Sequence, residues 1–100
     1  MSKTRELYEK ITENINGDTF RQDEFVEDFR ELTTLTKDLS GEERNKNVVT
    51  VISISRQATV RCRFPFMVFF GQWLEDLNDD PNALTSVQVN ALALEMGYPM

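Results

Sequence analysis

Residues 64–77, FPFMVFFGQWLEDL, are the stretch that most constrains the fold of this chain. Five of the ten aromatic residues lie between Phe64 and Trp73. Read as a helix, the stretch gathers apolar side chains on one face at the i, i+3, i+4, i+7 spacing of an amphipathic helix. This face holds Phe66, Phe69, Phe70, Trp73 and Leu77. Because the missing N–H of proline has no partner at a first helical position, the helix is predicted to begin at Pro65.

The opposite face of this helix is also apolar over its first two turns. It holds Met67, Val68, Gly71 and Leu74. A helix that is apolar all round is either buried in a core or seated in an interface. The core of a small domain is the favoured interpretation. The alternative is a partner-binding surface, for which the candidate residues are Phe66, Phe69, Phe70 and Trp73.

Length and composition predict one small globular domain, residues 1–100. The chain is 40% apolar and 28% charged, which is typical of a folded protein. No apolar run reaches the ~18 residues of a membrane span, and the N-terminus, MSKTRELYEK, has no apolar signal region. A single cysteine, Cys62, excludes an intrachain disulfide. We therefore expect a cytoplasmic protein with no membrane partner.

The absence of histidine bears on catalysis. Histidine is the commonest general base and the commonest metal ligand, and the chain has none. Serine–histidine and cysteine–histidine nucleophile pairs are therefore excluded. An aspartate-rich run, Asp76–Asp80, begins like a calcium loop, but Pro81 stands where such a loop needs glycine. We expect no catalytic residues, no metal site and no cofactor, and hence no enzyme.

Three further helices are predicted from capping signals and apolar periodicity. The first runs from an N-cap at Ser2 to Gly17, since serine caps helix starts and glycine often follows helix ends. The second starts at residue 18 or 19 and ends near residue 39, and residues 42–47 are read as a loop. The last starts at residue 85 or 86 and ends at Gly97.

A β-hairpin is predicted between the second helix and the aromatic helix. Residues 47–55, NVVTVISIS, are rich in the β-branched residues that favour strands. Residues 58–64 alternate between apolar and polar, as a half-buried strand does. The predicted fold is therefore α+β, with two N-terminal helices, an antiparallel hairpin and two C-terminal helices. The aromatic helix would cover the hairpin, and a second subunit could add a third strand.

Three arginines, Arg56, Arg61 and Arg63, fall on the polar side of this predicted hairpin. Arginine suits bidentate recognition of carboxylates and phosphates, so the cluster is a candidate contact for an acidic partner. Ion pairing with the acidic second helix is the favoured interpretation. The net charge of −6 makes direct binding to nucleic acid unexpected.

The second helix carries a row of acidic residues on one side. The row consists of Asp23, Glu24, Glu27, Asp28 and Glu31. Such a row is usually a solvated helix face. The alternative is a mimic of the DNA backbone that occupies the basic groove of a DNA-binding protein.

The functional prediction is a small, acidic, non-enzymatic protein that binds and modulates, by inhibition, a macromolecular protein partner. This profile is similar to that of inhibitor or accessory proteins of phages and mobile elements, an analogy of size and charge alone. One alternative is a DNA mimic directed at a host DNA-processing or defence protein. The other is a homo-oligomeric structural or assembly protein, with the aromatic face as its subunit contact.

Overall fold

The protein is described by a computed structural model that covers residues 2–58, 64–80 and 83–98, with the backbone alone at 64–69. This part of the chain forms five α-helices and no strand. They are α1 (Lys3–Asn16), α2 (Gln22–Asp38), α3 (Gly41–Ala58), α4 (Phe64–Asn78) and α5 (Ser86–Glu95). The predicted α+β fold is therefore wrong, and the domain is helical throughout the described ranges.

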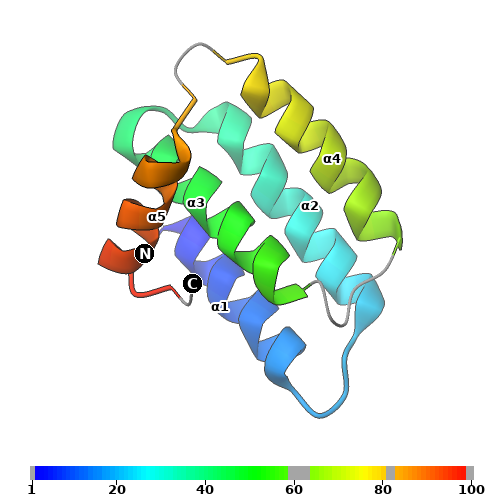
Figure 1. The fold of residues 1–100 in the computed structure, drawn as a ribbon. Helices are drawn as coiled ribbons and strands as arrows, with labels where there is room; N and C mark the ends of the chain where they lie inside the picture. The colour runs from blue at the N-terminus through cyan, green and yellow to red at the C-terminus, as the bar shows by residue number, and fades with distance from the viewer. Residues whose placement is uncertain (1, 59–63, 81–82, 99–100) are drawn as a thin grey trace.

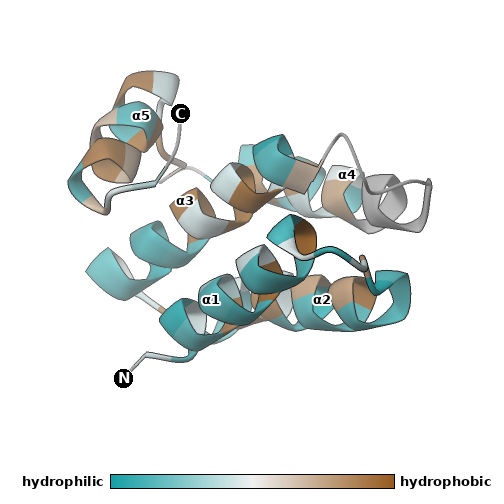
Figure 2. Ribbon diagram, turned by 90° about the horizontal axis from the view of Figure 1, so that it is seen from below, coloured by the Kyte–Doolittle hydropathy of each residue, from teal (hydrophilic) through white to brown (hydrophobic). Residues whose placement is uncertain are grey.

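The helices are arranged around α3. Helices α1 and α2 form an antiparallel pair, and α3 packs against both. Helix α4 runs beside α2, and α5 packs on the side of α3 away from α1 (Figures 1 and 2). The molecule measures 38 × 26 × 23 Å. The aromatic helix, α4, therefore packs against α2 and not against a hairpin as predicted.

The start of α1 and the turn after it follow from local hydrogen bonds. Ser2 caps α1 as predicted, because its Oγ accepts from the Arg5 N–H at 3.1 Å. In the loop that follows Gly17, the backbone of Arg21 forms two hydrogen bonds of 2.9 Å with the Asn14 side chain. These bonds hold residues 17–21 as a loop, so α2 starts at Gln22 and not at residue 18 or 19.

Helix α3 replaces both the predicted loop at 42–47 and the first predicted strand. Helix signals were present there: Ser40 followed by Glu43 has the spacing of a capping box, and Lys46 pairs with Glu42 one turn away at 3.5 Å. The β-branched residues cost the helix at most roughly 0.7 kcal/mol each. Burial of the helix on several sides outweighs that cost. The second predicted strand runs from Ala58, which ends α3, across residues 59–63, which lie outside the described part, to Phe64 in α4.

The main core lies between α1, α2, α3 and α4. Its buried side chains are Leu7, Ile11, Ile15, Phe25, Phe29, Leu32, Val48, Val51, Ile54, Ala58 and Trp73. A second cluster joins α5 to the other side of α3 and consists of Val49, Val89, Ala93 and Tyr98. Helix α3 supplies residues to both clusters, which explains why its apolar pattern does not show a single face.

A buried polar network links four of the helices. Asn47 of α3 is fully buried, and its Nδ2 donates to the Leu32 carbonyl at 3.0 Å and to Thr36 Oγ1 at 2.8 Å, both on α2. Its Oδ1 accepts from Thr4 Oγ1 of α1 at 2.8 Å. Trp73 of α4 also donates to Thr36. The network satisfies the buried amide fully and fixes how α1, α2, α3 and α4 meet.

The end of α5 directs the chain back onto the core. Gly97 has a positive φ of 76° and ends the helix as predicted. The Gly97 N–H donates to the Leu94 carbonyl and the Tyr98 N–H to the Ala93 carbonyl, the bonding pattern of a Schellman motif. Tyr98 then stacks on Tyr8 of α1, with ring centroids 4.3 Å apart.

Within the described ranges, no helix combines the length and the apolar character that a bilayer span requires.

Candidate binding surfaces

The described part of the aromatic helix faces inward. Trp73 is 8% exposed, and its Nε1 donates to Thr36 Oγ1 at 3.1 Å. Phe70 is half-buried, stacks on Trp73 and meets Phe29 edge-on at 6.0 Å. Trp73 is therefore a core residue in this structure and not an open anchor. The other two candidate aromatics, Phe66 and Phe69, have side chains outside the described part.

The predicted arginine cluster loses its structural basis. Arg56 lies in the last turn of α3 and is exposed, so it is on a helix and not on the polar side of a hairpin. Arg61 and Arg63 lie outside the described residues. The predicted hairpin is therefore wrong at Arg56, and the grouping of Arg56 with Arg61 and Arg63 stays a prediction.

The predicted acidic row divides into buried and exposed members. Asp28 is 5% exposed and accepts from Lys10 Nζ of α1 at 3.1 Å, so it belongs to the α1–α2 contact. This hydrogen bond and the charge of Asp28 raise the pKa of Lys10. Glu24 is exposed but accepts from Arg21 Nε at 2.6 Å, and this bond lowers the pKa of Glu24.

The remaining acidic residues of the row, Asp23, Glu27 and Glu31, are exposed and lie along a groove on α2. The groove has a volume of about 760 Å³. Its described lining is Gln22, Asp23, Val26, Glu27, Arg30, Glu31, Thr34, Leu35 and Asp38. We call this surface the α2 groove. It contains four carboxylates and one guanidinium, a net charge of −3.

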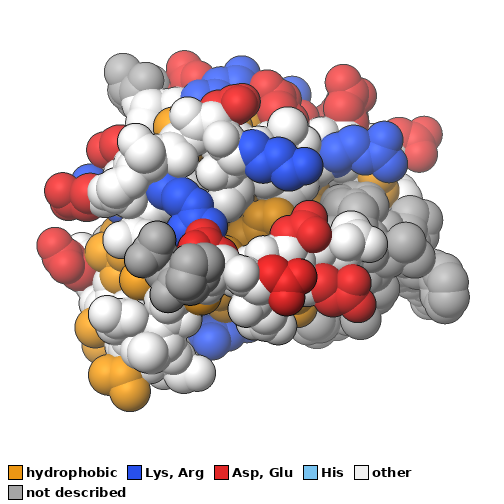
Figure 3. Space-filling view, turned by 90° about the horizontal axis from the view of Figure 1, so that it is seen from above, with side chains coloured by type: hydrophobic (Ala, Val, Ile, Leu, Met, Phe, Trp, Pro, Cys, Tyr) orange, Lys and Arg blue, Asp and Glu red, His pale blue; other side chains and the backbone are white. Residues whose placement is uncertain are grey.

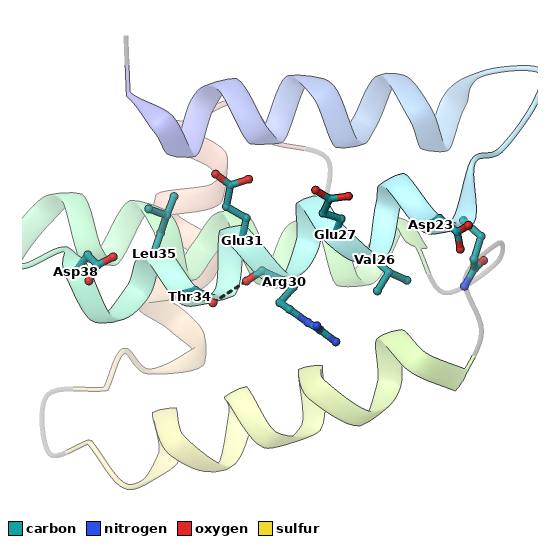
Figure 4. Close-up of a pocket in the computed structure, with 9 residues that line it drawn as sticks. Asp23, Val26, Glu27, Arg30, Glu31, Thr34, Leu35 and Asp38 are labelled. Atoms are coloured by element: carbon teal, nitrogen blue, oxygen red, sulfur yellow. Dashed lines mark hydrogen bonds between the residues drawn. The ribbon is translucent and has the colours of Figure 1, made fainter.

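The side chains of the α2 groove divide by chemistry. Figure 4 shows Glu27 and Glu31 on the side of α2 toward α1, and Val26 and Arg30 on the side toward α4. Val26 and Leu35 are half-buried and supply apolar surface. Glu31 makes an exposed ion pair with Lys3 at 3.3 Å, a contact of small energetic value. The groove therefore offers a row of carboxylates with one apolar side chain at each edge.

Sequence reasoning missed part of this groove. Arg30, Thr34, Leu35 and Asp38 were not among the predicted site residues, although they continue the helical spacing of Asp23 and Glu27 down the same side. The sequence signal for these residues was the spacing of three and four residues, which continues from Asp23 to the end of α2.

Helix α5 presents a second surface, an apolar stripe open to solvent. Val87 is 77% exposed and Leu94 is 66% exposed, and the exposed Ala91 lies between them. We call these three residues the α5 stripe. The opposite side of α5 packs on α3 through Val89 and Ala93. Figure 3 shows hydrophobic side chains at the surface over α5.

Other chemistry on the described surface is sparse. No group of three or more His, Cys, Asp or Glu residues in the described ranges is arranged to hold a metal ion. No family model, no curated protein and no solved structure matches the chain. The α2 groove and the α5 stripe are therefore the two candidate binding surfaces of the described chain.

Proposed function

We propose that this protein is a non-enzymatic cytoplasmic binder that modulates a protein partner through the α2 groove. The observation that carries the proposal is the combination of exposed carboxylates and apolar side chains on one exposed side of α2. Val26 and Leu35 are nine residues apart and so lie at opposite edges of this side. Asp23, Glu27 and Asp38 lie between these edges and provide exposed carboxylates that make no salt bridge within the described residues.

The chemistry of the groove defines the partner. A row of carboxylates with an apolar side chain at each edge complements a segment in which lysine or arginine is flanked by apolar side chains, such as one face of a basic amphipathic helix. Charge complementarity of this kind steers association and gives specificity. Binding would cover a regulatory or substrate-binding segment of the partner and so inhibit it.

A DNA mimic is the second candidate, because Asp23, Glu27 and Glu31 form a regular row of carboxylates. They recur every four residues, which separates them by roughly 6 Å along the helix axis. Regularly spaced negative charge is also what the DNA backbone presents to a basic groove. A mimic depends on the carboxylates alone, whereas an amphipathic segment also needs the apolar edges.

The test is affinity capture from host lysate with three variants of the tagged protein. The carboxylate variant carries Asp23→Asn, Glu27→Gln and Asp38→Asn. The control variant, with the same change in charge away from the groove, carries Glu6→Gln, Glu13→Gln and Asp18→Asn, all exposed positions. We expect the carboxylate variant to lose at least 90% of the captured partner and the control to keep it. Equal capture by both variants would refute the assignment of the groove.

The edge variant, Val26→Ser, separates the two candidates. An amphipathic protein segment should bind it at least several-fold more weakly, because the apolar contact is lost. A DNA-mimic mode predicts unchanged binding to this variant and release of the partner by competing duplex DNA. Loss of binding to the edge variant without release by DNA supports the protein-segment mode.

A further inference from the structure

Asn16 and Gly17 form the junction at the C-terminal end of α1, and this pair is the only Asn-Gly sequence in the chain. Asparagine is a thermally labile residue. Its lability is greatest before glycine, because glycine has no Cβ to shield its backbone nitrogen. Asn16 is exposed and shares an open surface hollow of about 450 Å³ with Gly17. Solvent therefore reaches the side-chain amide and the peptide bond that follows it.

The two asparagines near this junction have opposite surroundings. Asn14 is 2% exposed, and two hydrogen bonds of 2.9 Å tie its amide to the Arg21 backbone. Asn16 is outside that network, and its side chain makes no hydrogen bond to the rest of the described chain. The Gly17 N–H donates to the Asn14 carbonyl over 3.4 Å, a long bond in a last helical turn, where helices fray. Opening of this turn brings the Gly17 nitrogen within reach of the Asn16 side chain.

We propose that Asn16 is a site of spontaneous deamidation through a cyclic imide. The Gly17 backbone nitrogen gives its proton to hydroxide and attacks Cγ of Asn16, and the new C–N bond closes a succinimide ring. The bond from Cγ to the side-chain nitrogen then breaks, and this nitrogen takes a proton from water and leaves as ammonia. A second water adds to one of the two ring carbonyls and opens the ring.

The ring opens to two products. Cleavage of the bond from Cγ to the Gly17 nitrogen gives aspartate with a normal backbone. Cleavage of the bond from the Asn16 backbone carbonyl carbon to the same nitrogen gives isoaspartate, whose main chain is one methylene longer. Both products add a carboxylate at the negative end of the α1 dipole, in a hollow that Glu9 and Glu13 already line.

The isoaspartate also changes the connection between α1 and α2. The loop after Gly17 is held by the Asn14–Arg21 hydrogen bonds and by Phe20, which packs 5.8 Å from the Phe25 ring. The extra methylene enters the main chain directly before this anchored loop. This inference goes beyond the proposed function and does not depend on it, because neither residue of the Asn-Gly pair lines the α2 groove.

Ageing of the purified full chain in neutral and mildly alkaline buffer tests the proposal. Ion-exchange chromatography should resolve a more acidic form that accumulates with time, and peptide mapping by mass spectrometry should place the change at Asn16. The rate should rise with pH, because hydroxide takes the proton from the attacking nitrogen. Asn78 is the internal control, since it is exposed and ends α4 but precedes Asp79. The Asp79 side chain shields the peptide nitrogen, so Asn78 should react at least several-fold more slowly.

Two variants at this exposed position separate the steps. Asn16→Gln keeps an uncharged amide but closes the larger ring much more slowly, so its acidic form should accumulate at least several-fold more slowly. Asn16→Asp reproduces the charge of the product with the normal backbone. An isoaspartyl methyltransferase, which transfers a methyl group from S-adenosylmethionine to the free carboxylate of isoaspartate, should label the aged wild type several-fold more than fresh Asn16→Asp. In urea, the isoaspartyl fraction should unfold at a lower concentration than Asn16→Asp.

Three results would overturn this inference. They are an Asn16 amide that lasts as long as that of Asn78, an acidic form that accumulates equally fast in Asn16→Gln, and an acidic form without isoaspartate. The last result would indicate direct hydrolysis of the amide, which gives aspartate alone. Equal unfolding of the isoaspartyl fraction and Asn16→Asp would refute the effect on the α1–α2 connection. None of these bears on capture by the α2 groove, so failure here is distinguishable from failure of the proposed function.

Discussion

Trp73 and Thr36 are joined by a hydrogen bond of 3.1 Å from the indole Nε1 to the threonine hydroxyl. The same hydroxyl accepts from Asn47 Nδ2 at 2.8 Å, so one oxygen of α2 binds donors from both α3 and α4. This arrangement explains why the most aromatic helix of the chain is held against α2. It also gives the largest side chain of α4 a structural role.

Asn47 should be the polar residue on which stability depends most. Replacing it by alanine removes three hydrogen bonds and leaves the buried Thr4 and Thr36 hydroxyls and the Leu32 carbonyl without a partner amide. We expect the free energy of unfolding to fall by about 2–4 kcal/mol for Asn47→Ala. Urea unfolding followed by circular dichroism measures this change. Asn45→Ala, at a partly exposed position of the same helix, should change stability by less than about 0.5 kcal/mol.

The acceptor role of Thr36 can be tested with little change in side-chain size. Thr36→Val keeps the volume and removes the oxygen that accepts from Trp73 and Asn47. Two buried donors then lack a partner, which should lower the free energy of unfolding by about 1–3 kcal/mol. The exposed Thr34→Val is the control, and equal stability of the two variants would show that the Thr36 hydroxyl contributes nothing.

Neutralising Asp28 should lower the stability of the protein more than neutralising Glu27, although the two residues are neighbours on α2. Asp28→Asn removes a buried carboxylate that accepts from Lys10, and we expect a loss of about 1–2 kcal/mol of stability. Glu27→Gln changes an exposed residue of the α2 groove and should cost less than about 0.5 kcal/mol. Thermal unfolding of both variants distinguishes the structural acid from the surface acid. Similar losses would contradict the burial of Asp28.

Tyr98 should make the fold sensitive to alkaline pH. Burial raises the pKa of Tyr98, although its hydrogen bond with Thr50 acts in the opposite direction. Because the folded protein holds the phenol proton more tightly than the unfolded chain does, this contribution to stability is complete below about pH 10. It is lost as the pH rises above that value.

Tyr98→Phe isolates this contribution. The substitution removes the phenol hydroxyl and with it the 2.7 Å hydrogen bond between Thr50 and Tyr98. We expect the variant to lose about 1 kcal/mol at neutral pH. It should also lose less stability than the wild type between pH 9 and 11, and parallel pH profiles in urea titrations would count against the argument.

The helices at both ends of the chain were predictable because their signals are local. Ser2 and Thr85 cap α1 and α5 as the sequence suggested, and Gly97 ends α5. Each of these residues acts on groups within a few positions of itself. Capping and chain-ending preferences therefore decided these boundaries without reference to the rest of the fold.

The central helix was not predictable by the same reasoning. Residues 47–55 favour a strand by composition, but burial against α1, α2 and α5 decided the outcome. A short apolar run does not distinguish a buried helix from a buried strand by periodicity. The predicted positions of the aromatic helix and of the arginines were then based on a hairpin that residues 2–58 and 64–80 do not form.

The candidate site was predicted in part. Asp23, Glu27 and Glu31 were identified as an acidic row, and they line the α2 groove. Asp28 was wrongly given an outward position, because charge pattern alone does not reveal that α1 covers this part of α2 and supplies Lys10. The half-buried Val26 and Leu35 at the edges of the groove depend on which side of α2 the other helices leave exposed, which is a property of the tertiary arrangement.

The one-sided attachment of α5 has a consequence for the order in which the protein opens. Helices α1, α2 and α3 contact one another in all pairs, whereas α5 packs mainly on α3 and is followed by the Tyr98 contact. Elements with few neighbours open locally at a lower free energy than the whole domain unfolds. In native-state hydrogen exchange, the amides of α5 should therefore form a separate, early-exchanging unit, while α1–α3 exchange only with global unfolding.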